Sequence, residues 1–440
     1  MSISHPNFEL PVEDTENDYD EDCEPPPELL RLVEQETREI KPHEEILERV
    51  NLGEDGEEKH VKIGTSLTKE MQERLYSLLR EFKDVFAWSY QDMPGLDPDI
   101  VQHKLPLKPE CAPIKQKLRR MKPEMAQKIK EEVEKQFNAG FLVVAKYPQW
   151  VENVVLVPKK YGKVKMCVDY WDLNRAGPKD DFPLQHIDTL VDNTATSSLY
   201  SFMDGFSGYN QIKIAPKNME KTTFITLWGT FCYKVMSFIL KNVGATYQRA
   251  MVTLLHDMMH KEIEIYVDDM IAKSKSEEKH LANLRKLFER LRKFKLRLNP
   301  AKYTFGVRFG KLLGFIVSQK GIEVDPDKVR AILQMPHTCT EKEIQGFLGR
   351  LNYIARFISH LTSTCKPIFK LLRKNQTKEW NEECQVAFEK IKQYLQEPPI
   401  LRPPVSGRPL ILYLTVLDGS MGCVLGQHDE TGKKEHAIIT

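Results

Sequence analysis

The stretch Tyr266-Val267-Asp268-Asp269 lies within a mostly apolar run, residues 263–270, and sets two adjacent carboxylates where a strand turns back on itself. Successive side chains of a regular strand point to opposite faces, so the chain must bend here if both carboxylates are to face one site. Two acids placed in this way outline a metal site, which requires a third carboxylate from elsewhere. The alternative is a solvated hairpin turn, in which Asp268 and Asp269 serve only the turn.

The third carboxylate is predicted to be Asp204, which closes a second hydrophobic strand, residues 199–204. Glycines follow it closely and let the backbone turn sharply. Bringing two carboxylates within ~4 Å costs on the order of 4 kcal/mol at an effective dielectric of about 20, so only a bound cation makes this arrangement favourable. Oxygen ligands alone select a hard ion, and the sequence therefore predicts Mg²⁺ or Mn²⁺ at Asp204, Asp268 and Asp269.

The length and composition indicate an ordinary globular protein with more than one lobe. At 440 residues the chain exceeds the usual limit of a single core. No apolar run approaches the roughly 20 residues of a membrane span, and residues 1–6 lack the basic-then-apolar form of a signal peptide. We therefore expect an intracellular protein of the cytoplasm or nucleus, with no membrane partner.

The net charge of +1 averages two unlike regions. Of the 63 acidic and 64 basic residues, residues 1–60 hold 20 and 5, which leaves 43 acidic and 59 basic residues for the rest of the chain. A basic body with an acidic leader suits a nucleic-acid binder whose N-terminal arm avoids the polyanion. An acidic, disordered linker without an electrostatic role is an equally open interpretation.

The spacing of apolar residues predicts an α+β chain, because a series of strands is followed by a run of helices. Strands are predicted at residues 152–158, 164–170, 199–204, 211–214 and 231–238, with a hairpin at 263–273, a strand pair at 312–318 and a new first strand at 410–414. Helices are predicted at residues 66–86, 122–138, 245–260, 277–294, 328–333, 341–360 and 383–395.

Seven motifs follow one another in a fixed order between about residues 82 and 395. They are VDYWDLN at 168–174, KDDFPL at 179–184, FMDGFSGY at 202–209, KN and ATYQR within 241–249, YVDD at 266–269, LGFI at 313–316 and FLGRLNY at 347–353. Each motif is weak alone, but in this order the chain resembles the reverse transcriptase of gypsy-type LTR retrotransposons of plants.

The resemblance implies a right-hand polymerase fold and divides the chain into segments. These are an acidic disordered linker at 1–60, an N-terminal helical extension at 61–115, fingers at 116–198, a palm with a fingers insertion at 199–275, a thumb and primer-grip region at 276–335, a connection at 336–400 and a truncated ribonuclease H-like start at 401–440. The position of the family's first nuclease acid is Thr415, with Asp418 three residues further on, so ribonuclease H activity is not expected.

The resemblance also implies an RNA-directed DNA polymerase, which takes dNTPs and a primer on an RNA or DNA template. Asp204 and Asp268 would bridge two Mg²⁺ or Mn²⁺ ions, and Asp269 would support them. A basic helix near residues 286–295 would follow the template-primer duplex. Six phosphate contacts would weaken this binding about 10³-fold between 50 and 200 mM salt.

The resemblance assigns five residues to the nucleotide. Tyr209 would lie beneath the incoming sugar, where its ring collides with a 2′-hydroxyl and favours deoxynucleotides. Phe238 would pack near the same sugar, and Lys165 would contact the triphosphate. Lys160 and Tyr266 complete the set. Without the resemblance, an aromatic residue in such a place is more often part of a core, and lysine clusters are more often solvated faces.

Four residues depart from the pattern of the relatives. Trp171 stands where relatives carry arginine, and a bulky ring cannot replace a charged fork. Ser237 and Leu227 replace prolines, and Ile239 replaces a glycine, which is costly if the position needs a positive φ or a close backbone approach. These changes favour a second hypothesis, a catalytically decayed remnant that only binds nucleic acid duplex.

Overall fold

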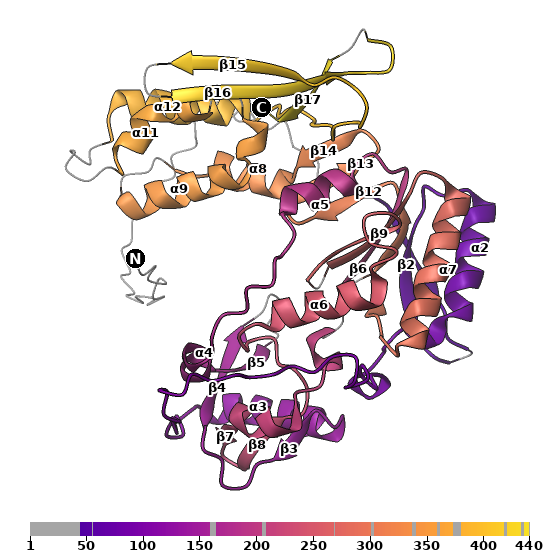
Figure 1. Ribbon diagram of the computed structural model, residues 1–440, viewed down its shortest axis with the longest axis vertical. Helices are drawn as coiled ribbons and strands as arrows, with labels where there is room; N and C mark the ends of the chain where they lie inside the picture. The colour runs from indigo at the N-terminus through magenta and orange to yellow at the C-terminus, as the bar shows by residue number, and fades with distance from the viewer. Residues whose placement is uncertain are drawn as a thin grey trace, which may run out of the picture. The chain divides into compact units, whose positions relative to one another are not determined.

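The computed structural model describes residues 45–54, 56–158, 164–204, 208–267, 269–300, 303–336, 340–358, 361–372, 380–417, 420–432 and 435–439. Within these ranges the strands form four sheets, which Figure 1 shows with the helices around them. No helix in these ranges is both long enough and apolar enough to cross a membrane.

The sheet that carries two of the predicted acids has six strands in the spatial order β1-β2-β11-β6-β10-β9. Its strands are β1 (Leu47–Asn51), β2 (His60–Gly64), β11 (Thr304–Val307), β6 (Leu199–Asp204), β10 (Asp269–Ser274) and β9 (Ile263–Tyr266). Helix α7 (Glu277–Lys293) packs against β6 and β10, and α2 (Lys69–Glu81) packs against α7 (Figure 1). The apolar residues of the central strands are thereby buried, including Leu199, Ile271 and Phe305.

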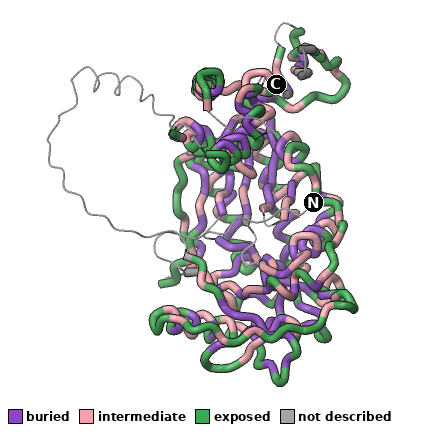
Figure 2. The backbone as a smooth tube through the Cα atoms, turned by 90° about the vertical axis from the view of Figure 1, so that its left-hand side faces the viewer, coloured by how far each residue is buried: buried purple, intermediate pink, exposed green. Residues whose placement is uncertain are grey.

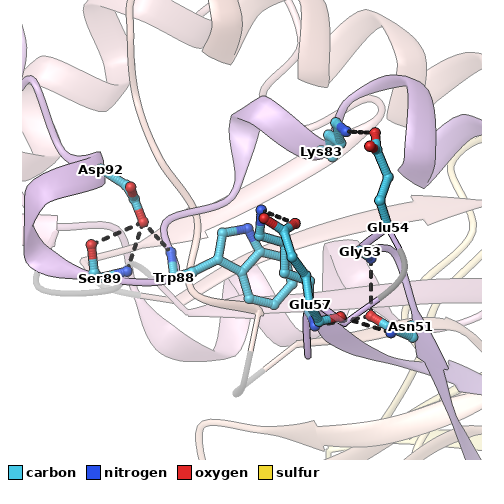
Figure 3. Close-up of polar contacts among 9 residues, drawn as sticks. Asn51, Gly53, Glu54, Glu57, Lys83, Trp88, Ser89 and Asp92 are labelled. Atoms are coloured by element: carbon cyan, nitrogen blue, oxygen red, sulfur yellow. Dashed lines mark hydrogen bonds and ion pairs between the residues drawn. The ribbon is translucent and has the colours of Figure 1, made fainter.

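Strand β1 lies inside the segment 1–60 that the sequence predicts to be a linker. It pairs antiparallel with β2, and the Asn51 side chain fixes the connecting turn. Its Oδ1 accepts from the Gly53 amide at 2.9 Å, and its Nδ2 donates to the Glu57 carbonyl at 2.8 Å (Figure 3). The predicted boundary is therefore too late, because a polar segment becomes a strand only through its partner, which composition does not show. Residues 1–44 lie outside the described ranges.

A second sheet has five strands in the order β3-β8-β7-β4-β5. They are β3 (Leu142–Val144), β8 (Gly229–Tyr233), β7 (Phe224–Thr226), β4 (Glu152–Pro158) and β5 (Val164–Val168). Helix α3 (Pro123–Asn138) packs against β3 and β5. Its first residue is Pro123, at a position where the missing N–H of proline has no cost.

Two predicted strands differ from the structure. The strand expected at residues 231–238 ends at Tyr233. The strand expected at residues 211–214 is wrong, since the 3₁₀ helix η4 (Gly208–Gln211) occupies its start and Lys213 and Ile214 make only isolated bridges. Ile212 and Ile214 are buried although the segment is irregular, so the alternation predicted their burial correctly and the strand conformation wrongly.

Three helices lie between the strands of these two sheets in sequence. Two of them, α4 (Trp171–Ala176) and α5 (Ile187–Thr194), are too short to show a helical period and were not predicted. The third, α6 (Val243–Leu255), was predicted, and it packs against β9 and η4. Buried residues of both sheets, of α4 and of α6 belong to one hydrophobic cluster, and Figure 2 colours the buried stretches purple. The two sheets are therefore held together by a shared core.

The basic helix α7 has a packed apolar face, and several of its basic side chains are paired. Its apolar face lies on the six-stranded sheet, and four of its basic side chains are already neutralised by acids from neighbouring segments. These ion pairs are Arg285 with Glu81, Lys286 with Glu262, Arg290 with Asp257 and Arg292 with Asp84. Because exposed ion pairs of this kind are weak, they do not decide whether the helix contacts a duplex, and its place in a thumb stays a prediction.

The C-terminal part carries two small antiparallel sheets and five helices. The sheets are β12 (Phe309–Leu312), β13 (Phe315–Ser318) and β14 (Gly321–Val324), and then β15 (Ile411–Leu417), β16 (Ser420–His428) and β17 (Glu435–Ile439). The helices are α8 (Pro326–Leu333), α9 (Glu341–Tyr353), α10 (Leu361–Thr364), α11 (Lys366–Lys370) and α12 (Glu382–Tyr394). The single strand predicted near residue 410 is thus the first of three, and the helix predicted at 341–360 ends earlier.

Candidate active site

The register of the six-stranded sheet brings two predicted acids together. Strands β6 and β10 are antiparallel, and Asp269 stands directly opposite Asp204. Residues paired in this way have Cβ atoms about 4.5–5.5 Å apart on one face of the sheet. Asp268 and the side chain of Asp204 lie outside the described parts of the structure. The backbone therefore places Asp204 and Asp269 as neighbours, with Asp268 adjacent in sequence.

The turn before Asp269 is held in a strained conformation by a glutamine. Tyr266 pairs with Asp269 across a two-residue turn, whose first residue, Val267, has φ +53°. Such turns require positive φ, which a β-branched residue adopts only with strain. The buried Gln248 compensates, because its Oε1 accepts from the Val267 amide at 2.9 Å and its Nε2 donates to the Ile265 carbonyl at 3.1 Å. The sequence analysis quoted this glutamine within a motif and gave it no role.

Tyr209 is fixed by the same helix, α6. It is half-buried in η4, and its ring meets the buried Tyr247 ring edge-on, with centroids 5.5 Å apart. A Cβ at Gly208 would lie 3.0 Å from the Tyr247 ring, a tight contact that the ring would have to relieve by moving, so glycine suits this close approach. The structure thus gives Tyr209 a defined position, and it explains the glycine that precedes it.

Helix α6 also docks the KDDFPL segment. Arg249 donates from Nη2 to both carboxylate oxygens of Asp180, at 3.0 and 2.9 Å, and its guanidinium carbon lies 4.8 Å from the centroid of the Phe182 ring. Burial raises the pKa of Asp180, but the hydrogen bonds from Arg249 and the Phe182 amide, together with the charge of Arg249, outweigh it, and the pKa lies below its ordinary value. Motifs that are distant in sequence therefore meet on one helix.

Two of the predicted nucleotide-binding residues touch each other. Lys165, half-buried on β5, places its Nζ 3.2 Å from the centroid of the Phe238 ring, a cation–π contact. The loop that carries Phe238 is tied to α4 by Asn174, whose Nδ2 donates to the Ile239 carbonyl at 2.9 Å and whose Oδ1 accepts from the Lys241 amide at 2.7 Å. Lys160 lies outside the described ranges.

The departures from the family pattern are accommodated differently. Ile239 has no positive φ, and its side chain packs against the core, so the conformational cost considered for it is absent. Ser237 is buried. Trp171 is the first residue of α4 and is 62% exposed, so its ring replaces a charge at the surface without filling a cavity.

A small hollow lies beside the acids. Its volume is about 120 Å³, and it is lined by Phe202, Met203, Asp269, Met270, Ile271, Lys311 and Leu312. Among the described side chains, no group of three acids, histidines or cysteines could hold a metal ion. Two of the three predicted ligands are outside that set, and the opposed acids of β6 and β10 remain a fitting place for a hard cation, because like charges in this position repel.

Two family profiles match parts of the chain. Residues 157–317 match the family described as reverse transcriptase (RNA-dependent DNA polymerase), and residues 380–440 match an RNase H-like domain found in reverse transcriptase. The second match begins before residue 401, inside the segment that the sequence analysis assigned to a connection.

The similar curated proteins are transposon polyproteins. The Transposon Tf2-3 and Tf2-7 polyproteins of Schizosaccharomyces pombe are each 28% identical to the chain over 366 residues, which is 81% of this chain and 27% of theirs. The chain therefore spans about a quarter of the length of these relatives.

Solved structures with the same fold come from foamy virus. The foamy viral protease-reverse transcriptase dRH in complex with double-stranded DNA has a TM-score of 0.75 at 20% identity, covering 84% of this chain and 65% of that one. The protein in complex with an RNA/DNA hybrid has a TM-score of 0.71 at 20% identity, covering 84% and 50%. This likeness confirms the predicted α+β right-hand polymerase fold.

Proposed function

We propose that this chain, which contains the reverse transcriptase domain of a retrotransposon polyprotein, extends a primer 3′-hydroxyl with dNTPs along an RNA or DNA template. The observation that best supports this activity is the register that sets Asp269 opposite Asp204, next to Asp268. Like charges directly opposite each other destabilise a sheet, so their placement at two strand ends needs a functional reason.

The three acids are the proposed ligands of two Mg²⁺ or Mn²⁺ ions. When bound, these ions activate the primer hydroxyl and stabilise the leaving pyrophosphate. The chain's own contribution is to hold the carboxylates in place. The β6–β10 register sets the spacing of Asp204 and Asp269, and Gln248 fixes the turn that contains Asp268.

The nucleotide would lie between the acids of the six-stranded sheet and Lys165 on the five-stranded sheet. Tyr209 supports the sugar and excludes a 2′-hydroxyl, and its contact with Tyr247 supports this role. Lys165 holds the triphosphate, and the Phe238 ring, which packs near the sugar, positions the ammonium group of Lys165. Lys160 and Tyr266 complete the proposed set.

Helix α9 offers a surface for the template-primer duplex in addition to α7. Gln345, Gly346 and Gly349 are exposed on it, and a Cβ at either glycine would meet no atom within 4 Å. Each glycine costs about 1 kcal/mol in a helix relative to alanine, and the chain itself does not require one here. We therefore assign this face to the close approach of a duplex backbone.

The finer assignments follow from the motifs. We propose a gypsy-type LTR element of plant origin, acting in the cytoplasm or nucleus. Fingers at residues 116–198 and a palm from residue 199 fit the two large sheets. The thumb then includes α9, ahead of a connection and the ribonuclease H-like region.

Primer extension by the full chain tests the proposal. Primed poly(rA) and labelled dTTP should give Mg²⁺-dependent products, while Asp268→Asn should give none. Extension by the wild type that does not exceed this control would refute polymerase activity.

A second candidate is a duplex-binding remnant without catalysis, and the exposed Trp171 ring in place of a charge favours it. It predicts salt-sensitive binding of primed template with no incorporation. The triple reversion Trp171→Arg, Ser237→Pro and Ile239→Gly should then restore extension. If extension is not restored, these residues are not the cause of the lost activity.

A further inference from the structure

We propose that His280, on helix α7, is a positioning residue for the end of β6, where Asp204 stands. It acts through Ser201, three residues earlier on the same strand. This role rests on the proposed function, because Asp204 is a proposed metal ligand. Neither the motifs of the sequence nor the proposed site includes His280 or Ser201.

His280 is an imidazole enclosed in the core between α7 and the six-stranded sheet. Its side chain is fully buried, on the face of α7 that also buries Leu284, Leu287 and Leu291. Burial lowers the pKa of His280 from 6.5 to about 3, so the ring is neutral at ordinary pH. A neutral imidazole has one N–H donor and one acceptor nitrogen, and in a buried place both need partners.

Two serines on neighbouring strands supply these partners. Ser274 Oγ on β10 lies 3.0 Å from Nδ1 of His280, and Ser201 Oγ on β6 lies 2.8 Å from Nε2. Ser274 donates its single hydroxyl proton to the Ser276 carbonyl at 3.1 Å, so it can only accept from the ring. Nδ1 therefore carries the proton, and Nε2 accepts from the Ser201 hydroxyl. His280 thus links β6 to β10 with its ring in one orientation.

Ser201 lies opposite a β-bulge in the adjoining strand, β11. The β6–β11 register shifts between Thr304 and Val307, so that β11 has one residue more than β6 over this stretch. Gly306, inside the bulge, has φ +65°, and its amide donates to Ser201 Oγ at 3.1 Å. The Ser201 hydroxyl therefore accepts from the bulge and donates to His280.

The place of this network explains why polar groups are used in it. Ser201 is about 10 Å from Asp204 along the strand, at ~3.3 Å per residue. Bulges increase the local twist of a strand pair, so this bulge affects the direction in which β6 ends. A leucine at position 280 would bury the same helix face without the cost of desolvating polar groups. A fully bonded polar network, in contrast, selects one arrangement of its strands.

Two amide variants of the full chain separate the roles of the ring nitrogens. A glutamine side chain reaches the place of Nε2, so His280→Gln can still accept from Ser201. An asparagine side chain reaches only the place of Nδ1, so His280→Asn can donate only to Ser274. On primed poly(rA), His280→Asn should lower kcat about 10-fold or more, and His280→Gln should stay within about 3-fold of the wild type, since a misplacement of about 1 Å is costly. His280→Asn should also raise the Mg²⁺ concentration for half-maximal extension, and the KM for dTTP should not change.

Ser201→Ala tests the same link from the strand. It should lower kcat and raise the Mg²⁺ requirement as His280→Asn does. Thr194→Ala, which removes another buried hydroxyl group, from α5, should do neither. Thermal melting gives a temperature at which all variants are folded, and extension is compared there. Equal losses of kcat in His280→Gln and His280→Asn, or normal extension by Ser201→Ala, would overturn the inference, because a packing role does not distinguish the two ring nitrogens.

Amide hydrogen exchange without Mg²⁺ makes the result independent of polymerase activity. Residues 199–204 should exchange faster in His280→Asn and Ser201→Ala than in the wild type and His280→Gln, whereas residues 187–194 should not differ. A wild type that shows this pattern and extends no primer would refute the proposed function and support the positioning of β6. The same exchange of residues 199–204 in all four proteins would overturn the positioning role.

Discussion

Carboxylates lie close together in two places in this chain, and the repulsion between them is relieved in a different way in each place. In the six-stranded sheet, Asp269 is half-buried opposite Asp204 at the end of two strands. In the five-stranded sheet, Glu152 is fully buried at the start of β4, close to Asp172 and Asp169. Asp269 is partly accessible to solvent, whereas Glu152 is not.

In the five-stranded sheet, the charge of Glu152 is neutralised by a proton. Burial, with the charge of Asp172 second, raises the pKa of Glu152 from 4.5 to about 8. The Gln116 amide lies between the two acids and donates to Glu152 Oε2 and, at 3.1 Å, to Asp172 Oδ2. Asp169 instead pairs with Arg119 at 2.9 Å. Glu152, which is buried without a cation, is thus kept protonated. A carboxylate that reaches solvent can remain charged, as a metal ligand must.

The largest expected effect comes from removing the charge of Asp269, which stands opposite Asp204. Asp269→Asn should lower primer extension at least about 10²-fold, since a metal ligand is lost. Mg²⁺ at ten times its Kd should stabilise the wild type by about 1.4 kcal/mol and the variant by less. Thermal melting with and without Mg²⁺ measures this difference. A variant whose melting responds to Mg²⁺ as the wild type does would show that Asp269 is not a ligand.

The second prediction tests whether Glu152 is neutralised by a proton, through the pH dependence of stability. Because the pKa of Glu152 is raised from 4.5 to about 8, its contribution to stability is complete below about pH 4.5 and is lost as the pH rises through 8. Glu152→Gln should flatten this decline and make the variant more stable than the wild type at pH 9, by up to about 5 kcal/mol. Urea unfolding at pH 5, 7 and 9 measures it, and parallel curves for both proteins would contradict the buried-acid interpretation.

The smallest effect compares the glutamines that serve the two places. Gln248→Leu removes two hydrogen bonds to the backbone of the strained turn, and should lower the free energy of unfolding by about 1–3 kcal/mol and reduce extension. Gln116→Leu should destabilise the chain by a similar amount and leave the response to Mg²⁺ unchanged. Thr253→Ala, at an exposed position on α6, is the control. Equal losses of extension in both glutamine variants would remove the distinction between the two sites.

Much of the acid site could be predicted because its signals are local. Strand β6 was predicted with its observed bounds, and the hairpin of β9 and β10 was expected around the paired acids. The contribution of Gln248 could not be predicted, because its partners are backbone atoms of Val267 and Ile265, which every residue possesses.

The errors have a common physical origin. The apolar stripe of α7 correctly predicted a helix, but the acids that pair with Arg285 and Arg290 come from segments far away in sequence. Strand β1 has a mostly polar sequence and is defined only by its pairing with β2. Periodicity reports which face of an element is apolar, and it does not report which element covers that face.

The amino-acid sequence alone determined two apolar strands that end in acids, the turn between paired carboxylates, and the order of motifs that indicates a polymerase. The tertiary structure decided that Asp204 faces Asp269, that Gln248 holds the strained turn, and that Glu152 is buried beside Asp172. The division follows from the range of the forces. Side-chain alternation and turn preferences act over a few residues, whereas register, burial and pKa depend on segments that only the folded chain brings into contact.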